Sequence, residues 1–483
     1  MVLRGATNWF TRCCLYFKKE ASNEQIPTTI DALPTNWVMI STGPSIFSAT
    51  PPKPGSVAHA IDDNPIPIST NNALISLFQI DLIIKVAHYN IFTMFRKYPK
   101  LFKDPLIEHP IYDLNLPFSD YINQYKKIIA ENRLDLGENP QKIIDANAPF
   151  EFRPENPLIS EKHDGKLKFG ALMVHGLLDS CFIMRDIGAE LQSQGMLVRS
   201  VLLPGHGIVP GALLNVRYEE WLQALRYGIA SLKKEVDHIF LVGFSTGASL
   251  SLYHTMLDPS DITALIMLSP AFKIKSAFDF MSNWHEPISW AMPKLKWAYI
   301  GKEYNYTKYR SITFNSIYQV YRLTHAIKQI NHNKKPPCPI FMSLSYDDLI
   351  VSSEATIKYF TEHKDTRNQM ILYIGETHPL DDPRIIMRSA VYPEFNIINF
   401  SHIAIPVAPS NPHYGMNGDY PLASHIYEKS NQLYCALDKP HEIFYDVLFK
   451  LKLTHFKRER LTFNPDFQFM VQQMKSFTES FFS

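Results

Sequence analysis

The sequence predicts an α/β fold, with a mostly parallel central sheet flanked by helices. Three short apolar runs have the length of buried strands: residues 170–174, 239–242 and 339–345. Each run ends at a loop that contains glycine or polar residues. The second and third runs then lead into segments with a helical pattern. Buried strands that alternate with helices are typical of a parallel sheet.

The second run carries the most specific motif of the chain. It passes through Gly243-Phe-Ser245-Thr-Gly247 into a helix-compatible segment. A G-x-S-x-G motif between a strand and a helix predicts a nucleophile elbow, which presents its serine on a sharp, strained turn. We therefore expect Ser245 to be a nucleophile. We expect Gly243 and Gly247 to be small so that the strand and the helix can approach each other.

Three motifs in order give a family resemblance. His175-Gly-Leu177 is followed by Leu203-Pro-Gly-His-Gly207 and then by the elbow. The set resembles the monoacylglycerol-lipase and lysophospholipase-like branch of the α/β-hydrolase superfamily, over roughly residues 165–450. The resemblance implies an α/β-hydrolase fold with a helical cap and an N-terminal extension. It implies a substrate class only loosely.

The same resemblance implies an oxyanion hole made of two backbone N–H groups. These would belong to Leu177 and to Thr246, the residue after the nucleophile. We expect the side chains of His175 and His206 to brace their loops and to take no part in proton transfer.

The acid of a Ser-His-Asp triad is expected after the apolar run 339–345. Two aspartates follow it, in Tyr346-Asp347-Asp348-Leu-Ile-Val351. Relatives commonly show an acid followed by x-Ile-Val or x-Val-Val, a register that selects Asp348. Asp347 remains its competitor.

Two histidines compete for the role of base. Met370–Ile374 reads as a strand, and His378 lies on the loop after it, at the usual spacing from the acid. His402 follows the apolar run 396–400, in which we expect a strand over Ile397–Phe400, and leads into a Pro-x-Asn-Pro-x-Tyr-Gly sequence. That arrangement resembles a bacterial subgroup of these hydrolases with an inserted segment. The spacing favours His378 and the subgroup resemblance favours His402. We take His402 as the base and His378 as the alternative.

The remaining sequence suggests two domains or segments. Residues 1–150 are expected to form an extension that is partly irregular, with helices packed on the core, and residues 151–483 the α/β-hydrolase domain. Roughly seventy residues separate the strands at 265–268 and 339–345, more than a direct crossover needs, so we place a cap insertion at about 270–335. This interval is rich in large apolar side chains: Phe278, Phe280, Met281, Trp284, Trp290, Met292, Trp297 and Tyr299.

The two ends of the chain carry further apolar segments. The run 73–87 contains Asp81 and Lys85, which favours a packed helix over a membrane span. Helices are also expected at 439–453 and 465–482. In the second, an apolar stripe has helical spacing and is expected to pack on the sheet.

Composition restricts the function classes. The 483 residues carry a formal charge of +1, which gives no support for nucleic-acid binding. The five cysteines are scattered without metal-ligand spacing, and no P-loop or dinucleotide motif is present, so we expect reduced thiols, no metal and no cofactor. Residues 1–20 lack the apolar core of a secretory signal. We expect a cytoplasmic protein, with peripheral membrane contact as an option.

These observations predict a serine hydrolase that cleaves carboxylic esters, with a small-molecule or lipid ester such as a monoacylglycerol or a lysophospholipid as substrate. One alternative is a ligand-binding protein that keeps the fold without turnover. Another is a membrane-associated interaction protein, which would rest on acylation of Cys13 and Cys14 beside basic residues.

Overall fold

The structure of this protein is a computed structural model. The described residues are 99–110, 113–162, 165–275, 296–331, 336–375, 380–420, 432–436 and 457–482. Several predictions lie outside them: the helices at 73–87 and 439–453, the residues Cys13 and Cys14, the alternative base His378, and the cap residues from Phe278 to Met292.

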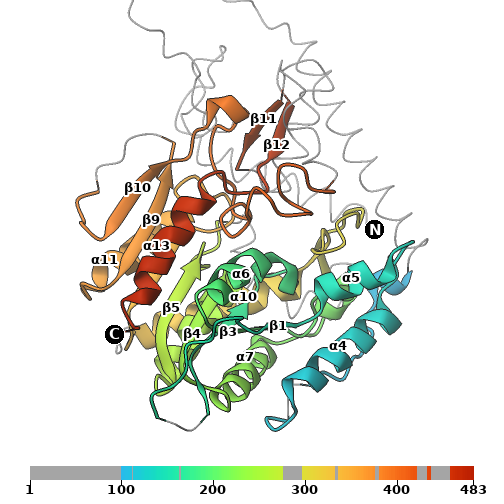
Figure 1. The fold of residues 1–483 in the computed structure, drawn as a ribbon. Helices are drawn as coiled ribbons and strands as arrows, with labels where there is room; N and C mark the ends of the chain where they lie inside the picture. Colours follow the sequence, from blue (N-terminus) through green and yellow to red (C-terminus); the bar gives the residue numbers. More distant parts are fainter. Residues whose placement is uncertain are drawn as a thin grey trace, which may run out of the picture. The chain divides into compact units, whose positions relative to one another are not determined.

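The centre of the described chain is an eight-stranded sheet with the order β1-β3-β2-β4-β5-β8-β9-β10 (Figure 1). All neighbouring pairs are parallel except β1 and β3. The predicted mostly parallel sheet is therefore confirmed. The strands are β1 Phe150–Phe152, β2 Leu167–Val174, β3 Leu197–Val201, β4 Val236–Phe244, β5 Ile262–Leu268, β8 Ile340–Ser345, β9 Gln369–Ile374 and β10 Ile385–Ser389.

Helices flank this sheet (Figure 1). They are α4 Phe118–Asn132, α5 Pro140–Asn147, α6 Arg185–Ser193, α7 Tyr218–Lys233, α8 Thr246–Leu257, α10 Phe314–Asn331, α11 Ser353–Glu362 and α13 Phe467–Glu479. Short 3-10 helices are η2 Pro99–Phe102, η3 Cys181–Met184, η4 Pro210–Leu213 and η7 Pro393–Phe395. Two further sheets have two strands each. One pairs β6 Trp297–Tyr299 with β7 Ile312–Thr313, and the other pairs β11 Gln432–Cys435 with β12 Lys457–Arg460.

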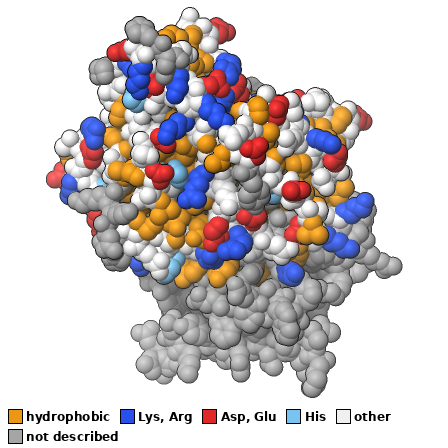
Figure 2. Space-filling model, turned by 90° about the horizontal axis from the view of Figure 1, so that it is seen from below, with side chains coloured by type: hydrophobic (Ala, Val, Ile, Leu, Met, Phe, Trp, Pro, Cys, Tyr) orange, Lys and Arg blue, Asp and Glu red, His pale blue; other side chains and the backbone are white. Residues whose placement is uncertain are grey.

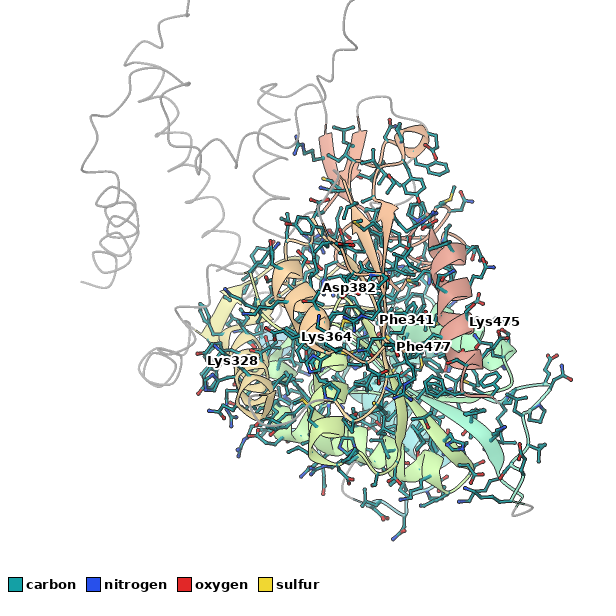
Figure 3. All side chains as sticks on the ribbon, turned by 90° about the vertical axis from the view of Figure 1, so that its left-hand side faces the viewer. Lys328, Phe341, Lys364, Asp382, Lys475 and Phe477 are labelled. Atoms are coloured by element: carbon teal, nitrogen blue, oxygen red, sulfur yellow. The ribbon has the colours of Figure 1, made fainter. Side chains whose placement is uncertain are left out.

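The helix α13 packs on the sheet, as its apolar stripe predicts. All five stripe residues are buried: Phe467, Met470, Val471, Met474 and Phe477. The ring of Phe477 lies 5.7 Å from that of Phe341 on β8 (Figure 3). Burial of such a stripe is the main source of stability for a surface helix.

The helices α4 and α5 lie before residue 151, in the part of the chain where we expect an extension with helices packed on the core, and they contribute to the same core as the sheet. Tyr121 and Tyr125 of α4 are fully buried, and the Tyr121 ring lies 4.6 Å from that of Tyr227 on α7. In the described part of the chain, the core therefore includes residues that come before the sheet begins.

The expected strand at Ile397–Phe400 is wrong. Ile397 makes only isolated bridges, to Tyr392 and Tyr434. The 3-10 turn η7 and the left-handed Asn396, with φ of 55°, fold the chain back so that Ile397 lies opposite Tyr392. The edge strand is instead β10, which pairs in parallel with β9.

Charges of both signs share the surface in the view of Figure 2. Lys and Arg side chains are interspersed there with Asp and Glu, and hydrophobic side chains lie between them. This pattern fits the formal charge of +1, because a basic face for nucleic acid would gather one sign of charge.

Candidate active site

Ser245 stands at the turn between β4 and α8. Its backbone has φ of 53° and ψ of −114°, a conformation that non-glycine residues rarely adopt. Backbone hydrogen bonds hold it there: Ser245 N–H donates to Leu268 O at 2.8 Å, and Ser245 O accepts from Ala271 N–H at 3.3 Å and from Ser249 N–H at 3.2 Å. The turn thus has the strained geometry of a nucleophile elbow.

Glycine is required at both ends of the elbow motif because neighbouring backbone atoms approach these two residues closely. A Cβ atom on Gly243 would lie 2.4 Å from the backbone of Ala248. A Cβ atom on Gly247 would lie 2.1 Å from the carbonyl oxygen of Val174 on β2. The expectation that both residues must be small is confirmed. The absence of these side chains lets α8 begin directly above β4.

Two backbone N–H groups beside the elbow are free to bind a ligand. Thr246 is the first residue of α8, so its N–H has no partner within the helix. Leu177 lies in the turn that follows β2. Within the described residues, neither N–H group donates a hydrogen bond to the protein. These are the two groups that the sequence assigned to an oxyanion hole.

His175 and His206 brace the neighbouring loops. His175 is fully buried, and its Nε2 accepts a hydrogen bond from Leu203 N–H at 3.0 Å. Its Nδ1 lies 2.8 Å from Gly176 O. Burial lowers the pKa of His175 well below its usual value, and burial lowers that of His206 to about 4. Both rings are therefore neutral at pH 7 and join the loops after β2 and β3 to each other, as expected.

Asp348 is a completely buried carboxylate at the end of β8. Its Oδ1 accepts hydrogen bonds from the N–H groups of Ile350 at 2.7 Å and Val351 at 3.1 Å. Its Oδ2 lies 2.5 Å from Nδ1 of His402. The carboxylate is thus held by its own loop and turned toward the imidazole.

His402 lies next to the elbow. Its side chain is 10% exposed, and its ring centroid is 5.0 Å from that of Phe244, which immediately precedes Ser245. With Nδ1 donating to Asp348, the other ring nitrogen is left to accept a proton. Among the described residues, no direct hydrogen bond joins Ser245 Oγ to His402. In hydrolases without substrate this contact is often long and shortens when substrate binds.

The two competing residues are placed differently. Asp347 is half-buried, and its Oδ2 would lie 3.2 Å from a Cβ atom on Gly375, so this carboxylate faces the end of β9. His378 lies outside the described residues. The structure therefore brings Asp348 and His402 together, with His402 against Phe244, the residue that precedes Ser245.

The segment after His402 ties its loop to the rest of the domain. Ser401 Oγ donates to Leu461 O, and Asn464 N–H donates to Val407 O at 2.9 Å. Asp186 of α6 accepts hydrogen bonds from Ala408 N–H and from the Asn411 side chain, both at 2.8 Å. The histidine loop is therefore fixed from two sides.

A buried hydrogen-bonded group links the same segment to residues between β6 and β7. The Tyr414 hydroxyl contacts Asn305 Nδ2 at 2.8 Å and Thr307 Oγ1 at 2.7 Å. His413 Nε2 lies 3.0 Å from Asn305 Oδ1. We did not single out these residues from the sequence. The only available signal was the Pro-x-Asn-Pro-x-Tyr-Gly run, which contains Asn411 and Tyr414.

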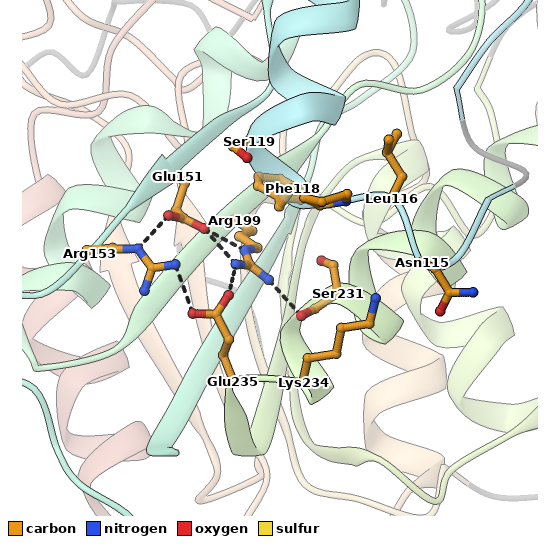
Figure 4. A pocket seen from close by; sticks show the side chains of 11 residues that line it. Asn115, Leu116, Phe118, Ser119, Glu151, Arg153, Arg199, Ser231, Lys234 and Glu235 are labelled. Atoms are coloured by element: carbon orange, nitrogen blue, oxygen red, sulfur yellow. Dashed lines mark hydrogen bonds and ion pairs between the residues drawn. The ribbon is translucent and has the colours of Figure 1, made fainter. Parts of the chain in front are cut away.

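A cavity of about 340 Å³ lies elsewhere, between α4, β1, β3 and the end of α7 (Figure 4). Arg199 in its wall is only 3% exposed, and it pairs with Glu151 and Glu235. Glu235 directly precedes β4, whereas Ser245 directly follows it. The strand between them spans roughly 30 Å, so this cavity is separate from the elbow.

The sheet topology and the elbow define the chain as an α/β-hydrolase. Comparison with known families agrees, because residues 170–381 match the family described as "Serine aminopeptidase, S33". The match contains Ser245 and Asp348 and ends before His402. The chain therefore has the α/β-hydrolase fold and is similar to ester hydrolases of the lipase kind.

Within this class the chain is similar to monoacylglycerol lipases. It is 24% identical to the thermostable monoacylglycerol lipase of Bacillus sp. (strain H-257) over 229 residues, which cover 46% of this chain and 88% of the relative. The solved monoacylglycerol lipase of Paleococcus ferrophilus is 19% identical, with a TM-score of 0.38 over 47% of this chain and 88% of that one. A structure from work on the metagenome-derived lipolytic enzymes LipS and LipT is 16% identical, with a TM-score of 0.39 over 46% and 86%.

Neither a membrane span nor a metal cluster is found in the described residues. None of their helices has both the length and the apolar character that crossing a membrane requires. No group of three or more His, Cys, Asp or Glu residues among them is placed to hold a metal ion.

Proposed function

We propose that this protein is a serine ester hydrolase that works through Ser245, His402 and Asp348. The observation that carries the proposal is the contact between His402 Nδ1 and the buried Asp348 Oδ2, at 2.5 Å, beside the strained elbow that presents Ser245. A carboxylate that orients a histidine next to an elbow serine is the arrangement that activates a hydroxyl for nucleophilic attack.

The reaction follows from these positions. Ser245 Oγ attacks the ester carbonyl while His402 Nε2 takes the hydroxyl proton, and Asp348 stabilises the resulting imidazolium. The N–H groups of Leu177 and Thr246 stabilise the oxyanion, each by roughly 2.7–4 kcal/mol. The intermediate then collapses, and the alcohol leaves with the proton from His402. A water molecule, deprotonated by the same histidine, hydrolyses the acyl-enzyme and releases the acid.

The substrate we propose is a lipid-like ester of the monoacylglycerol or lysophospholipid type. Two observations support it: the similarity to the monoacylglycerol lipase of Bacillus sp. (strain H-257), and the large apolar side chains that the sequence places between residues 278 and 299. An acyl chain requires apolar walls near the nucleophile.

The test is labelling with a fluorophosphonate probe, run beside hydrolysis of monoacylglycerols of increasing chain length. The wild-type chain is expected to be labelled and to hydrolyse the esters, and Ser245→Ala is expected to lose both activities with an unchanged melting temperature. Ser251→Ala is the matched control on the same helix, because its hydroxyl only donates to Gly247 O at 2.8 Å.

Hydrolysis by Ser245→Ala at the wild-type rate would remove the mechanism. A folded wild-type chain that is neither labelled nor active would instead favour a ligand-binding protein on this fold.

A further inference from the structure

The loop that carries Leu177 is tied by an ion pair to the segment between β6 and β7. Asp179 Oδ1 lies 2.6 Å from Lys308 Nζ, and the two side chains are only 3% and 15% exposed. The next residues are joined as well, because Tyr309 N–H donates to Leu178 O at 2.9 Å. Two neighbouring residues of one segment thus hold two neighbouring residues of the other.

The carboxylate of Asp179 lies against the backbone of the same loop. Its Oδ2 is 2.9 Å from the position that a Cβ atom on Gly176 would take. Between them stand Leu177, with its unpaired N–H, and Leu178, whose φ of 68° is unusual for a side-chain-bearing residue. A negative charge in this position would oppose an oxyanion on Leu177 N–H, unless a cation cancels it.

The position of Lys308 suits that task. Tyr309, beside it, also holds the loop after β3, because its hydroxyl accepts from Ile208 N–H at 2.6 Å and lies 3.2 Å from Gly205 O. Burial lowers the pKa of Lys308, while the nearby Asp179 opposes this effect and favours the charged amine. Lys308 is therefore anchored among the loops that surround the elbow.

We propose that Lys308 is a positioning residue for ester hydrolysis: through Asp179 it fixes the loop that presents the Leu177 N–H and neutralises the carboxylate beside the developing oxyanion. The proposal rests on the serine ester hydrolase function above. It assigns Lys308 an effect on the transition state and little effect on substrate binding, so its removal should lower kcat and leave KM almost unchanged.

The test compares Lys308→Met with the double variant Asp179→Asn/Lys308→Met. Arg199→Met serves as control, because it also removes a buried, paired cation (Figure 4), and its partner Glu235 lies before β4, whereas Ser245 lies after it. For each variant, kcat, KM and the melting temperature are measured with the ester that the wild-type chain hydrolyses best.

We expect Lys308→Met to lower kcat on the order of 10²-fold, as a displaced catalytic loop does, with KM within about threefold of the wild-type value. The double variant should recover kcat roughly tenfold over Lys308→Met, because no unpaired carboxylate remains beside the oxyanion. Arg199→Met should keep the wild-type kcat even where its melting temperature falls.

A wild-type kcat in Lys308→Met would overturn the proposal. An equal loss of kcat in Arg199→Met would also overturn it, and so would a double variant whose kcat is no higher than that of Lys308→Met. If Lys308→Met does not fold, the double variant tests the proposal instead, because it leaves no unpaired Asp179 carboxylate buried in the protein. We expect its kcat to lie about tenfold below wild type at unchanged KM, and wild-type kcat would overturn the proposal. A wild-type chain without esterase activity would instead reject the proposed function.

Discussion

His402 and Asp348 are separated by 54 positions in the sequence, yet Nδ1 of the histidine lies 2.5 Å from Oδ2 of the carboxylate. The carboxylate is fully buried, and its other oxygen is occupied by two N–H groups of its own loop. Because of these contacts, the carboxylate group cannot rotate toward the solvent. Its orientation is fixed before any substrate arrives, and it fixes that of the imidazole.

The first prediction concerns this carboxylate. Asp348→Asn should lower kcat on the order of 10⁴-fold, because an amide no longer holds the imidazole in the required tautomer. The variant should keep its fold, since Asn preserves the shape and one oxygen. The measurement is the rate of ester hydrolysis at saturating substrate.

Asp347→Asn is the matched control one residue away. Its carboxylate faces Gly375, so kcat should stay within about tenfold of wild type. A larger loss in Asp347→Asn than in Asp348→Asn would mean that the acid is Asp347.

The second prediction concerns the base. His402→Ala should be nearly inactive, because Ser245 then lacks a group to accept its proton, whereas His378→Ala should keep nearly normal activity. Fluorophosphonate labelling rates measure the effect directly, since they depend on the reactivity of the serine. An inactive His378→Ala variant beside an active His402→Ala variant would transfer the role to His378 without changing the hydrolase assignment.

The sequence predicted the centre of the fold well because that part is governed by local patterns. The strands β2, β4, β5 and β8 are apolar runs buried on both faces, and the elbow has a motif of its own. Such segments differ clearly from their surroundings in a single sequence.

The edge of the sheet was harder to predict. In β10, Arg388 and its neighbours are partly exposed, so the strand does not read as an apolar run. The run at Ile397–Phe400 is apolar because Ile397 and Phe400 are buried, but their burial comes from loop packing. The apolar character of this run therefore predicted its burial correctly, but the strand that we inferred from it is wrong.

The candidate base could not be chosen from local patterns. Both histidines follow apolar runs, and only contacts distant in sequence distinguish them. His402 is held by Asp348 and its loop by Leu461 and Asn464. The pairing of Asp179 with Lys308, 129 positions apart, likewise has no sequence signal.

The third prediction concerns Gly247. Gly247→Ala should destabilise the fold by about 3 kcal/mol or more, because its Cβ would lie 2.1 Å from Val174 O and 2.6 Å from His175 O, and backbone atoms cannot move aside easily. Gly188→Ala in α6 is the matched control. Its Cβ would meet no atom closer than 3.4 Å, and alanine favours a helix, so stability should be unchanged or rise by about 0.5–1 kcal/mol. Denaturant unfolding measures both, and equal stability of the two variants would contradict the close approach.

The fourth prediction concerns the dependence of stability on pH. Burial lowers the pKa of His206 to about 4, whereas an unfolded histidine titrates near 6.5. Between these values the unfolded chain binds the proton and the folded chain does not, so the free energy of unfolding falls as the pH is lowered. Between pH 7 and pH 5 this one residue should remove about 2 kcal/mol.

His206→Asn tests this contribution. The amide N–H can still donate toward Leu203 O and Pro204 O, which His206 Nδ1 contacts at 3.1 Å, but it does not titrate. We therefore expect the variant to be less stable than wild type at pH 7, and to lose about 2 kcal/mol less than wild type when the pH is lowered to 5. Urea unfolding at both pH values gives the comparison. Parallel losses in the two proteins would show that His206 has the same pKa in the folded and the unfolded chain, and its role as a neutral brace between the loops after β2 and β3 would have to be abandoned.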